Sequence, residues 1–142
     1  MANENFYESA IRHWMDSCIL KEREEYDNAV CMQGFSAECA LKAIMQVILE
    51  NQDVKKYQHF GEALFQDIIM IISADLNLPA MISATWGLRL SSLSLPEILF
   101  QNHPERRYYS DGVYSEDDAD ACQDAAEVLI REMLSMRLDG YL

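Results

Sequence analysis

The sequence predicts an all-α protein, an antiparallel bundle of four to five helices that forms one domain over residues 1–142. Three observations support this prediction. Apolar residues recur at helical spacing through most of the chain. The 142 residues include only five glycines and three prolines, which argues against the frequent turns of a β architecture. Half of the residues are hydrophobic, so a chain of this length can bury a sizeable core.

The two N-terminal helices are expected over residues 4–20 and 24–50. In the first, apolar side chains such as Ile11 and Trp14 share one face of the helix. The second contains Gly34, but one glycine costs only about 1 kcal/mol relative to alanine in a helix interior. Because the apolar pattern continues across this glycine, we expect one uninterrupted helix.

Three further helices are expected over residues 60–72, 80–92 and 116–138. The helix at 60–72 is apolar nearly all round, which predicts burial on more than one side, either centrally or against a partner chain. The last helix should begin at a capping box formed by Ser115 and Asp118.

Residues 94–114 break the helical pattern, apart from a short helical piece expected at 96–101. Loops of this length in a compact domain are often functional. Arginine binds phosphate through a planar fork of donors, and tyrosine can stack on a base. Alternatively, an arginine of this loop could pair with Glu38 of the second helix and fix the loop to the bundle. The interaction-capable side chains of the loop are His103, Arg106, Arg107, Tyr108 and Tyr109.

The net charge of -13 argues against a general nucleic-acid-binding surface, which needs clustered basic residues. Only eleven lysines and arginines stand against twenty-four acidic residues. The acidic residues crowd positions 116–127, where they are best interpreted as a solvated helix face. A local basic groove elsewhere on the protein stays open as an alternative, although it would work against the net field.

Cysteine and histidine spacing predicts neither a metal site nor a cofactor. The four cysteines form no C-x-x-C pair and have no histidine at ligand spacing, so we expect reduced, buried thiols and no zinc. The first residues do not read as a signal peptide, which indicates a cytoplasmic protein. The longest apolar run, residues 68–72, is too short to span a membrane.

The common enzyme signatures are absent. The sequence has no glycine-rich phosphate loop, no G-x-S-x-G and no H-E-x-x-H. The three histidines, His13, His59 and His103, are far apart along the chain. A nucleophile pair assembled in space stays open, but no motif indicates one.

Several short segments, in the right order along nearly the whole chain, resemble a known family. Ala-Glu-Cys-Ala-Leu-Lys at positions 37–42 is similar to the second-helix signature of HEPN (higher eukaryote and prokaryote nucleotide-binding) domains. His59 falls where many members place a histidine that opens the third helix. Arg107-Tyr108 and the segment 114–119, followed by a final apolar helix, resemble the family's Arg-Tyr, Tyr and Asp-Ala positions.

The resemblance implies a helical bundle that usually dimerises. Members often accompany a minimal nucleotidyltransferase in toxin–antitoxin pairs, or act in antiviral and stress systems. Many are metal-independent ribonucleases that use an arginine and, four to six residues later, a histidine. This chain departs from that pattern, because no histidine follows Arg106 or Arg107 at that spacing. The missing acid–base partner argues against a catalytic ribonuclease.

The leading hypothesis is therefore a non-catalytic, HEPN-type module that acts as a homodimer and binds a nucleotide, an RNA end or a partner protein such as a nucleotidyltransferase. Glu38 and Lys42, four residues apart, can pair along the surface of the second helix. The groove of the dimer would be lined by Glu38, Lys42, Arg106, Arg107 and Tyr108.

Two alternatives remain. In the first, the chain is a ribonuclease with a rearranged site, in which His59 or His103 replaces the missing histidine and Arg106 or Arg107 stabilises the phosphate. In the second, it is a structural helical subunit that holds a larger complex together, with the apolar helix at 60–72 facing another protein.

Overall fold

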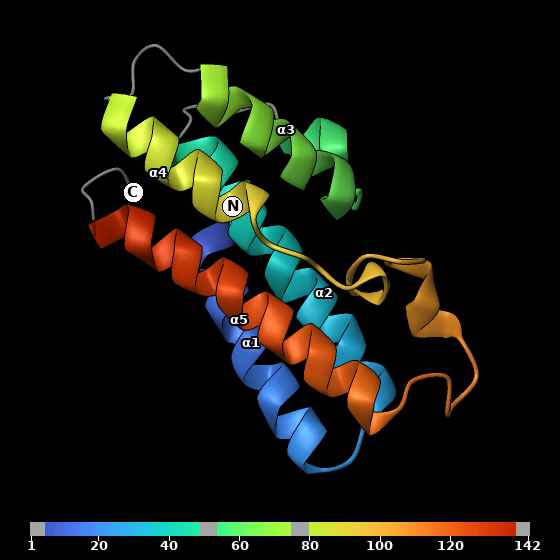
Figure 1. The fold of residues 1–142 in the computed structure, drawn as a ribbon. Helices are drawn as coiled ribbons and strands as arrows, with labels where there is room; N and C mark the ends of the chain where they lie inside the picture. Colours follow the sequence, from blue (N-terminus) through green and yellow to red (C-terminus); the bar gives the residue numbers. More distant parts are fainter. Residues whose placement is uncertain (1–4, 49–53, 75–79, 139–142) are drawn as a thin grey trace.

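In the computed structural model, the described part of the chain comprises residues 5–48, 54–74 and 80–138, and all of its regular elements are helices (Figure 1). Five are α-helices, one is a π-helical segment (η1) and three are short 3-10 helices. In chain order they are α1 (Phe6–Glu22), α2 (Tyr26–Ala43), η1 (Ile44–Ile48), η2 (Val54–Tyr57), α3 (Gly61–Ala74), α4 (Ala80–Ser91), η3 (Glu97–Leu99), η4 (Glu105–Tyr108) and α5 (Glu116–Leu138).

The core of the fold is a layer of three helices, in which α2 packs along both α1 and α5. Figure 1 shows α1 running antiparallel to α2, whereas α5 runs in the same direction as α2 after the long connection that follows α4. Helices α3 and α4 form an antiparallel pair that packs on the end of this layer, mainly through α3 against α2. The expected helical bundle is confirmed, with one parallel helix pair inside it.

Helix α2 is buried along most of its length because it carries small side chains. Ala29, Ala37 and Ala40 are fully buried, and they allow the neighbouring helices to approach closely. Two buried polar side chains of α2 also bond to the backbone of its neighbours. Ser36 donates to the Ala10 carbonyl at 2.7 Å and Gln33 donates to the Ala119 carbonyl at 3.0 Å.

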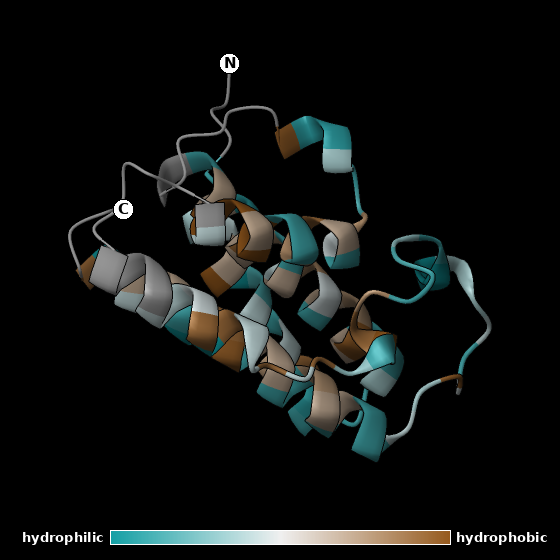
Figure 2. Cartoon of the chain, turned by 45° about the horizontal axis from the view of Figure 1, so that its top comes forward, coloured by the Kyte–Doolittle hydropathy of each residue, from teal (hydrophilic) through white to brown (hydrophobic). Residues whose placement is uncertain are grey.

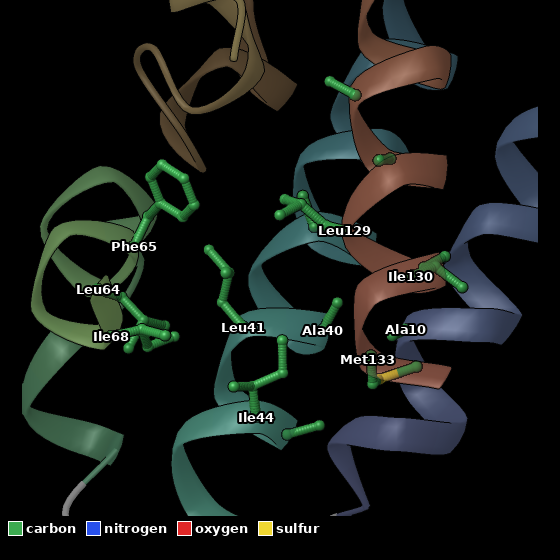
Figure 3. Close-up of a cluster of buried hydrophobic side chains, with 14 of the residues drawn as sticks. Ala10, Ala40, Leu41, Ile44, Leu64, Phe65, Ile68, Leu129, Ile130 and Met133 are labelled. Carbon is green, nitrogen blue, oxygen red and sulfur yellow. The ribbon is translucent and has the colours of Figure 1, made fainter. Parts of the chain in front are cut away.

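A second part of the core lies between α2 and α3. Figure 3 shows Leu41 and Ile44 pointing toward Leu64 and Ile68 of α3, with Leu129 of α5 on the other side. These five side chains are completely buried. At about 25 cal/mol per Å² of apolar surface, burying one such side chain contributes about 1.5–3 kcal/mol.

Among the described residues, the expected burial of the third helix on more than one side is not found. Helix α3 buries Leu64, Ile68 and Ile72, but the side chain of Met70 is 68 % exposed. In α4, Leu88 is likewise 72 % exposed. The apolar surface of the α3–α4 pair therefore extends beyond what the described residues cover, and burial against a partner chain stays a prediction.

The expected helix ends are largely confirmed. Helix α2 continues across Gly34, as predicted, but from Ile44 to Ile48 the chain is π-helical (η1). Residues 49–50, where this helix was expected to end, lie outside the described residues. Helix α5 begins at the predicted capping box, where the Asp118 amide donates to Ser115 Oγ at 3.2 Å and the Ser115 amide donates to Asp118 Oδ2 at 3.0 Å. Among the described residues, no helix combines the length and apolar character that crossing a membrane requires.

Candidate ligand-binding site

The carboxylate of Glu38, on the inner part of α2, is the centre of a buried polar cluster. It accepts a hydrogen bond from Lys42 Nζ at 2.8 Å, one helical turn further along. His59 Nδ1 lies 3.0 Å from Oε1 and 3.1 Å from Oε2, and His103 Nε2 lies 3.3 Å from Oε2. The predicted Glu38–Lys42 pair thus exists, but it is buried rather than on the helix surface.

All three histidines of the chain gather around one aromatic side chain of α2. The ring centroid of Phe35 lies 4.3 Å from that of His103, 6.0 Å from that of His59 and 5.9 Å from that of His13. The rings of His59 and His103 meet edge to face at 5.6 Å. No spacing in the sequence indicates this arrangement, because the three histidines come from α1, from the turn before α3 and from the loop after η3.

The hydrogen bonds of the cluster set its charge state. Burial by itself raises the pKa of Glu38, but hydrogen bonds from His103, Lys42 and His59 outweigh it and lower the pKa to about 2. Burial lowers the pKa of His103, although the hydrogen bond to Glu38 opposes this shift. Near neutral pH, Glu38 is therefore ionised and His103 neutral. The ammonium of Lys42 balances the buried carboxylate.

An open pocket of about 640 Å³ lies beside this cluster. His59 is the accessible member, because its side chain is 44 % exposed, whereas that of His103 is 0 % exposed and that of Glu38 is 3 % exposed. A ligand that enters from solvent therefore meets His59 first. The pocket is lined by His59, Phe60, Gly61, Glu62, Ala63, Gln66, Glu97, Phe100, Gln101, Asn102, His103 and Glu105.

Arg106 does not line this pocket, and it does not pair with Glu38. Its side chain is buried, and its guanidinium group donates to backbone carbonyls instead. Three of them belong to the η3 region, those of Ile98, of Leu99 at 2.7 Å and of Gln101 at 3.2 Å, and a fourth is that of Val30 in α2 at 3.3 Å. The expectation that an arginine fixes the loop to the bundle is correct, but the expected partner, Glu38, is wrong. The donors of the guanidinium group bond to these backbone carbonyls rather than to the carboxylate of Glu38.

Arg107 and Tyr108 lie outside the pocket. Tyr108 is 77 % exposed, and the guanidinium of Arg107 lies 5.0 Å from the centroid of the Tyr108 ring. Figure 2 shows the surrounding loop as hydrophilic. Among the residues predicted to share one ligand groove, Glu38 and Lys42 therefore meet inside the bundle, whereas Arg107 and Tyr108 form a separate exposed element.

The cluster has two chemical capacities. His59, whose Nδ1 contacts Glu38, can donate a second hydrogen bond to an anion in the pocket when its ring carries both protons, and it stands beside the exposed aromatic ring of Phe60. The ligating atoms of Glu38, His59 and His103 also lie within 4.8 Å of one another, a separation that suits a metal ion. The prediction of no metal site was based on the spacing of ligands along the chain. Such spacing cannot reveal a site whose ligands come from three separate segments.

No model of a known protein family, no curated protein and no solved structure matches this chain.

Proposed function

We propose that this protein is a non-catalytic, HEPN-type binding module that acts as a dimer and binds a nucleotide or the end of an RNA strand beside His59. The observation that carries the proposal is the convergence of three residues on which the resemblance rests. Glu38 and Lys42 pair on α2, and His59 from a distant segment bonds to the same carboxylate at the edge of an open pocket. A ligand site requires a few polar side chains that converge at a solvent-accessible pocket, and these three residues do so.

The pocket has the features that one nucleotide needs. His59, whose Nδ1 contacts Glu38, supplies a second hydrogen-bond donor for phosphate at Nε2 when its ring carries both protons. Phe60, which is 66 % exposed, and Phe100 supply aromatic surface for a base. The rim also carries the carboxylates of Glu62 and Glu97, which repel an extended phosphate backbone. The proposed ligand is therefore a single nucleotide or a strand end, in agreement with the net charge of -13.

Exposed apolar side chains support the dimer. Met70 of α3 and Leu88 of α4 are each more than 60 % exposed. Burying such side chains between two copies of the chain would add apolar contact area that one chain leaves in water. A second copy would also bring a second pocket, as expected for a symmetric assembly.

Titration of adenosine monophosphate and of a short single-stranded RNA with a 3′-phosphate, followed by calorimetry, tests the proposal. We expect saturable binding that His59→Ala weakens by more than about tenfold, because a hydrogen bond to a charged group contributes about 1.5–3 kcal/mol. His13→Ala is the matched control, since His13 also contacts Phe35 but does not line the pocket. Absence of binding by the wild-type protein would reject the proposal and favour the structural-subunit hypothesis.

A ribonuclease is the second candidate because two histidine rings lie 5.6 Å apart beside one carboxylate. General acid–base cleavage needs groups that reach the substrate. Here the side chain of His103 is fully buried, so His59 is the accessible histidine of the pair. We therefore favour binding without cleavage. Cleavage of RNA by the pure protein that disappears in His59→Ala would reverse this preference.

A further inference from the structure

Three side chains from three separate segments bring metal-ligating atoms together at the inner end of the pocket. Oε2 of Glu38 lies 3.1 Å from Nδ1 of His59 and 3.3 Å from Nε2 of His103. In a tetrahedral site with bonds of about 2.0–2.1 Å, neighbouring ligand atoms lie about 3.3–3.4 Å apart. Two of the three separations are therefore close to the tetrahedral value, and the third, between the two histidine nitrogens, is no longer than 4.8 Å.

We propose that Glu38, His59 and His103 form a binding site for a divalent transition-metal ion of the zinc class. Two imidazoles and one carboxylate are a ligand set that zinc uses where its fourth position stays open to water or to a ligand. His59 lines the pocket with a side chain that is 44 % exposed, so the fourth position would open toward the pocket beside His59. Imidazole nitrogen also favours zinc and its transition-metal neighbours over magnesium or calcium.

The surroundings of the cluster orient the carboxylate for this role. Lys42 bonds to Oε1 of Glu38 at 2.8 Å, which leaves Oε2 facing His103, and His59 lies about equally close to both oxygens. Such outer contacts commonly hold a metal-ligating carboxylate in one orientation. The ammonium of Lys42 repels a cation, but the carboxylates of Glu62 and Glu97 at the pocket rim and the net charge of -13 act in the opposite direction.

The histidines can present the required nitrogen atoms. Nδ1 of His103 is buried and has no hydrogen-bond partner within the described chain, so moving the proton to Nδ1 breaks no existing contact there. His59 has a side chain that is 44 % exposed, and it provides the entry path from solvent. The metal ion would replace the contacts of the two histidine nitrogens with the Glu38 carboxylate by two nitrogen–metal bonds and one oxygen–metal bond.

Calorimetric titration of Zn²⁺ into the metal-stripped full chain near neutral pH tests the site. We expect one ion per chain with saturable binding. His59→Ala should weaken it by more than about tenfold, since even outer-shell partners of a metal site contribute 10- to 100-fold. The exposure of His59 makes this variant the one that best preserves the fold, which circular dichroism checks. His13→Ala, which removes a histidine outside the triad, should bind as the wild type does.

Absorption spectra of the Co²⁺ complex separate this site from the cysteines. We expect ligand-field bands without a cobalt–thiolate charge-transfer band, because the proposed ligands are nitrogen and oxygen. A thiolate band, no saturable Zn²⁺ binding, or equal affinity in His59→Ala and wild type would each overturn the proposal. The titration uses no nucleotide, so a chain that binds Zn²⁺ but not adenosine monophosphate would reject the proposed function while supporting the metal site.

Discussion

The guanidinium group of Arg106 occupies the space beside the Cα atom of Gly34 that a β-carbon would take. The carbonyl oxygen of Leu99 lies 2.9 Å from that position, and Nδ1 of His103 lies 3.2 Å from it. A side chain at position 34 would therefore push apart the contacts that place His103 against Glu38. The glycine allows the loop to lie directly on α2.

Replacing Gly34 by alanine should consequently destabilise the protein, although alanine favours helix by about 1 kcal/mol. We expect a net loss of about 1–3 kcal/mol, because backbone and buried side-chain atoms must shift to relieve the overlap. Urea unfolding measures this loss. Gly87→Ala in α4 is the matched control, since its new β-carbon would meet Ser73 Oγ at 3.6 Å, an ordinary contact. A Gly34→Ala protein as stable as the control would contradict the prediction.

Alanine substitution of the adjacent arginines Arg106 and Arg107 should change the unfolding free energy to very different extents. Arg106 is 2 % exposed and donates to several carbonyls, so Arg106→Ala leaves buried acceptors unpaired and should cost about 2–4 kcal/mol in unfolding free energy. Arg107→Ala should change stability by less than about 0.5 kcal/mol, because its guanidinium stacks on an exposed tyrosine. Denaturant unfolding measures the loss of unfolding free energy in each variant. Equal losses in Arg106→Ala and Arg107→Ala would contradict the assignment of a structural role to Arg106 alone.

This pair also shows where sequence reasoning reached its limit. The two arginines have the same local chemistry, and the burial of one of them depends on how the loop folds back onto α2. The convergence of His59 and His103 depends on the same non-local packing. By contrast, the capping box of α5 and the Glu38–Lys42 pair involve residues three or four positions apart, and both were predictable.

The stability of the wild-type protein should fall as the pH drops below about 6.5, because His103 is buried in its neutral form. Burial lowers its pKa in the folded state, so the unfolded chain binds the proton more readily. The stability that neutral His103 contributes is therefore complete above pH 6.5, and it is lost as the pH falls through the lowered pKa of His103 in the folded state. His13, whose pKa burial also lowers, contributes in the same direction.

Unfolding free energies measured at several pH values between about 7 and 5 test this expectation. His103→Gln should show a shallower decline than the wild type over this window, although its stability at neutral pH will be lower. His13→Gln should also flatten the decline. A wild-type curve without any slope in this interval would show that neither imidazole is held neutral by the fold.

Ionisation of Glu38 should affect the unfolding free energy in a separate, more acidic pH range. Its folded pKa of about 2 lies below the ordinary value of 4.5, so its ionised form stabilises the fold above pH 4.5, and this contribution is lost as the pH falls toward 2. The shift corresponds to about 3 kcal/mol at neutral pH.

Glu38→Gln should therefore be strongly destabilised near neutrality, because the ammonium of Lys42 stays buried without its counter-charge. The difference between wild type and variant should narrow below pH 4.5, where the wild-type carboxylate also becomes neutral on unfolding. Glu62→Gln, at an exposed position of the pocket rim, is the control and should run parallel to the wild type. A constant difference between Glu38→Gln and wild type across this range would contradict the depressed pKa of Glu38.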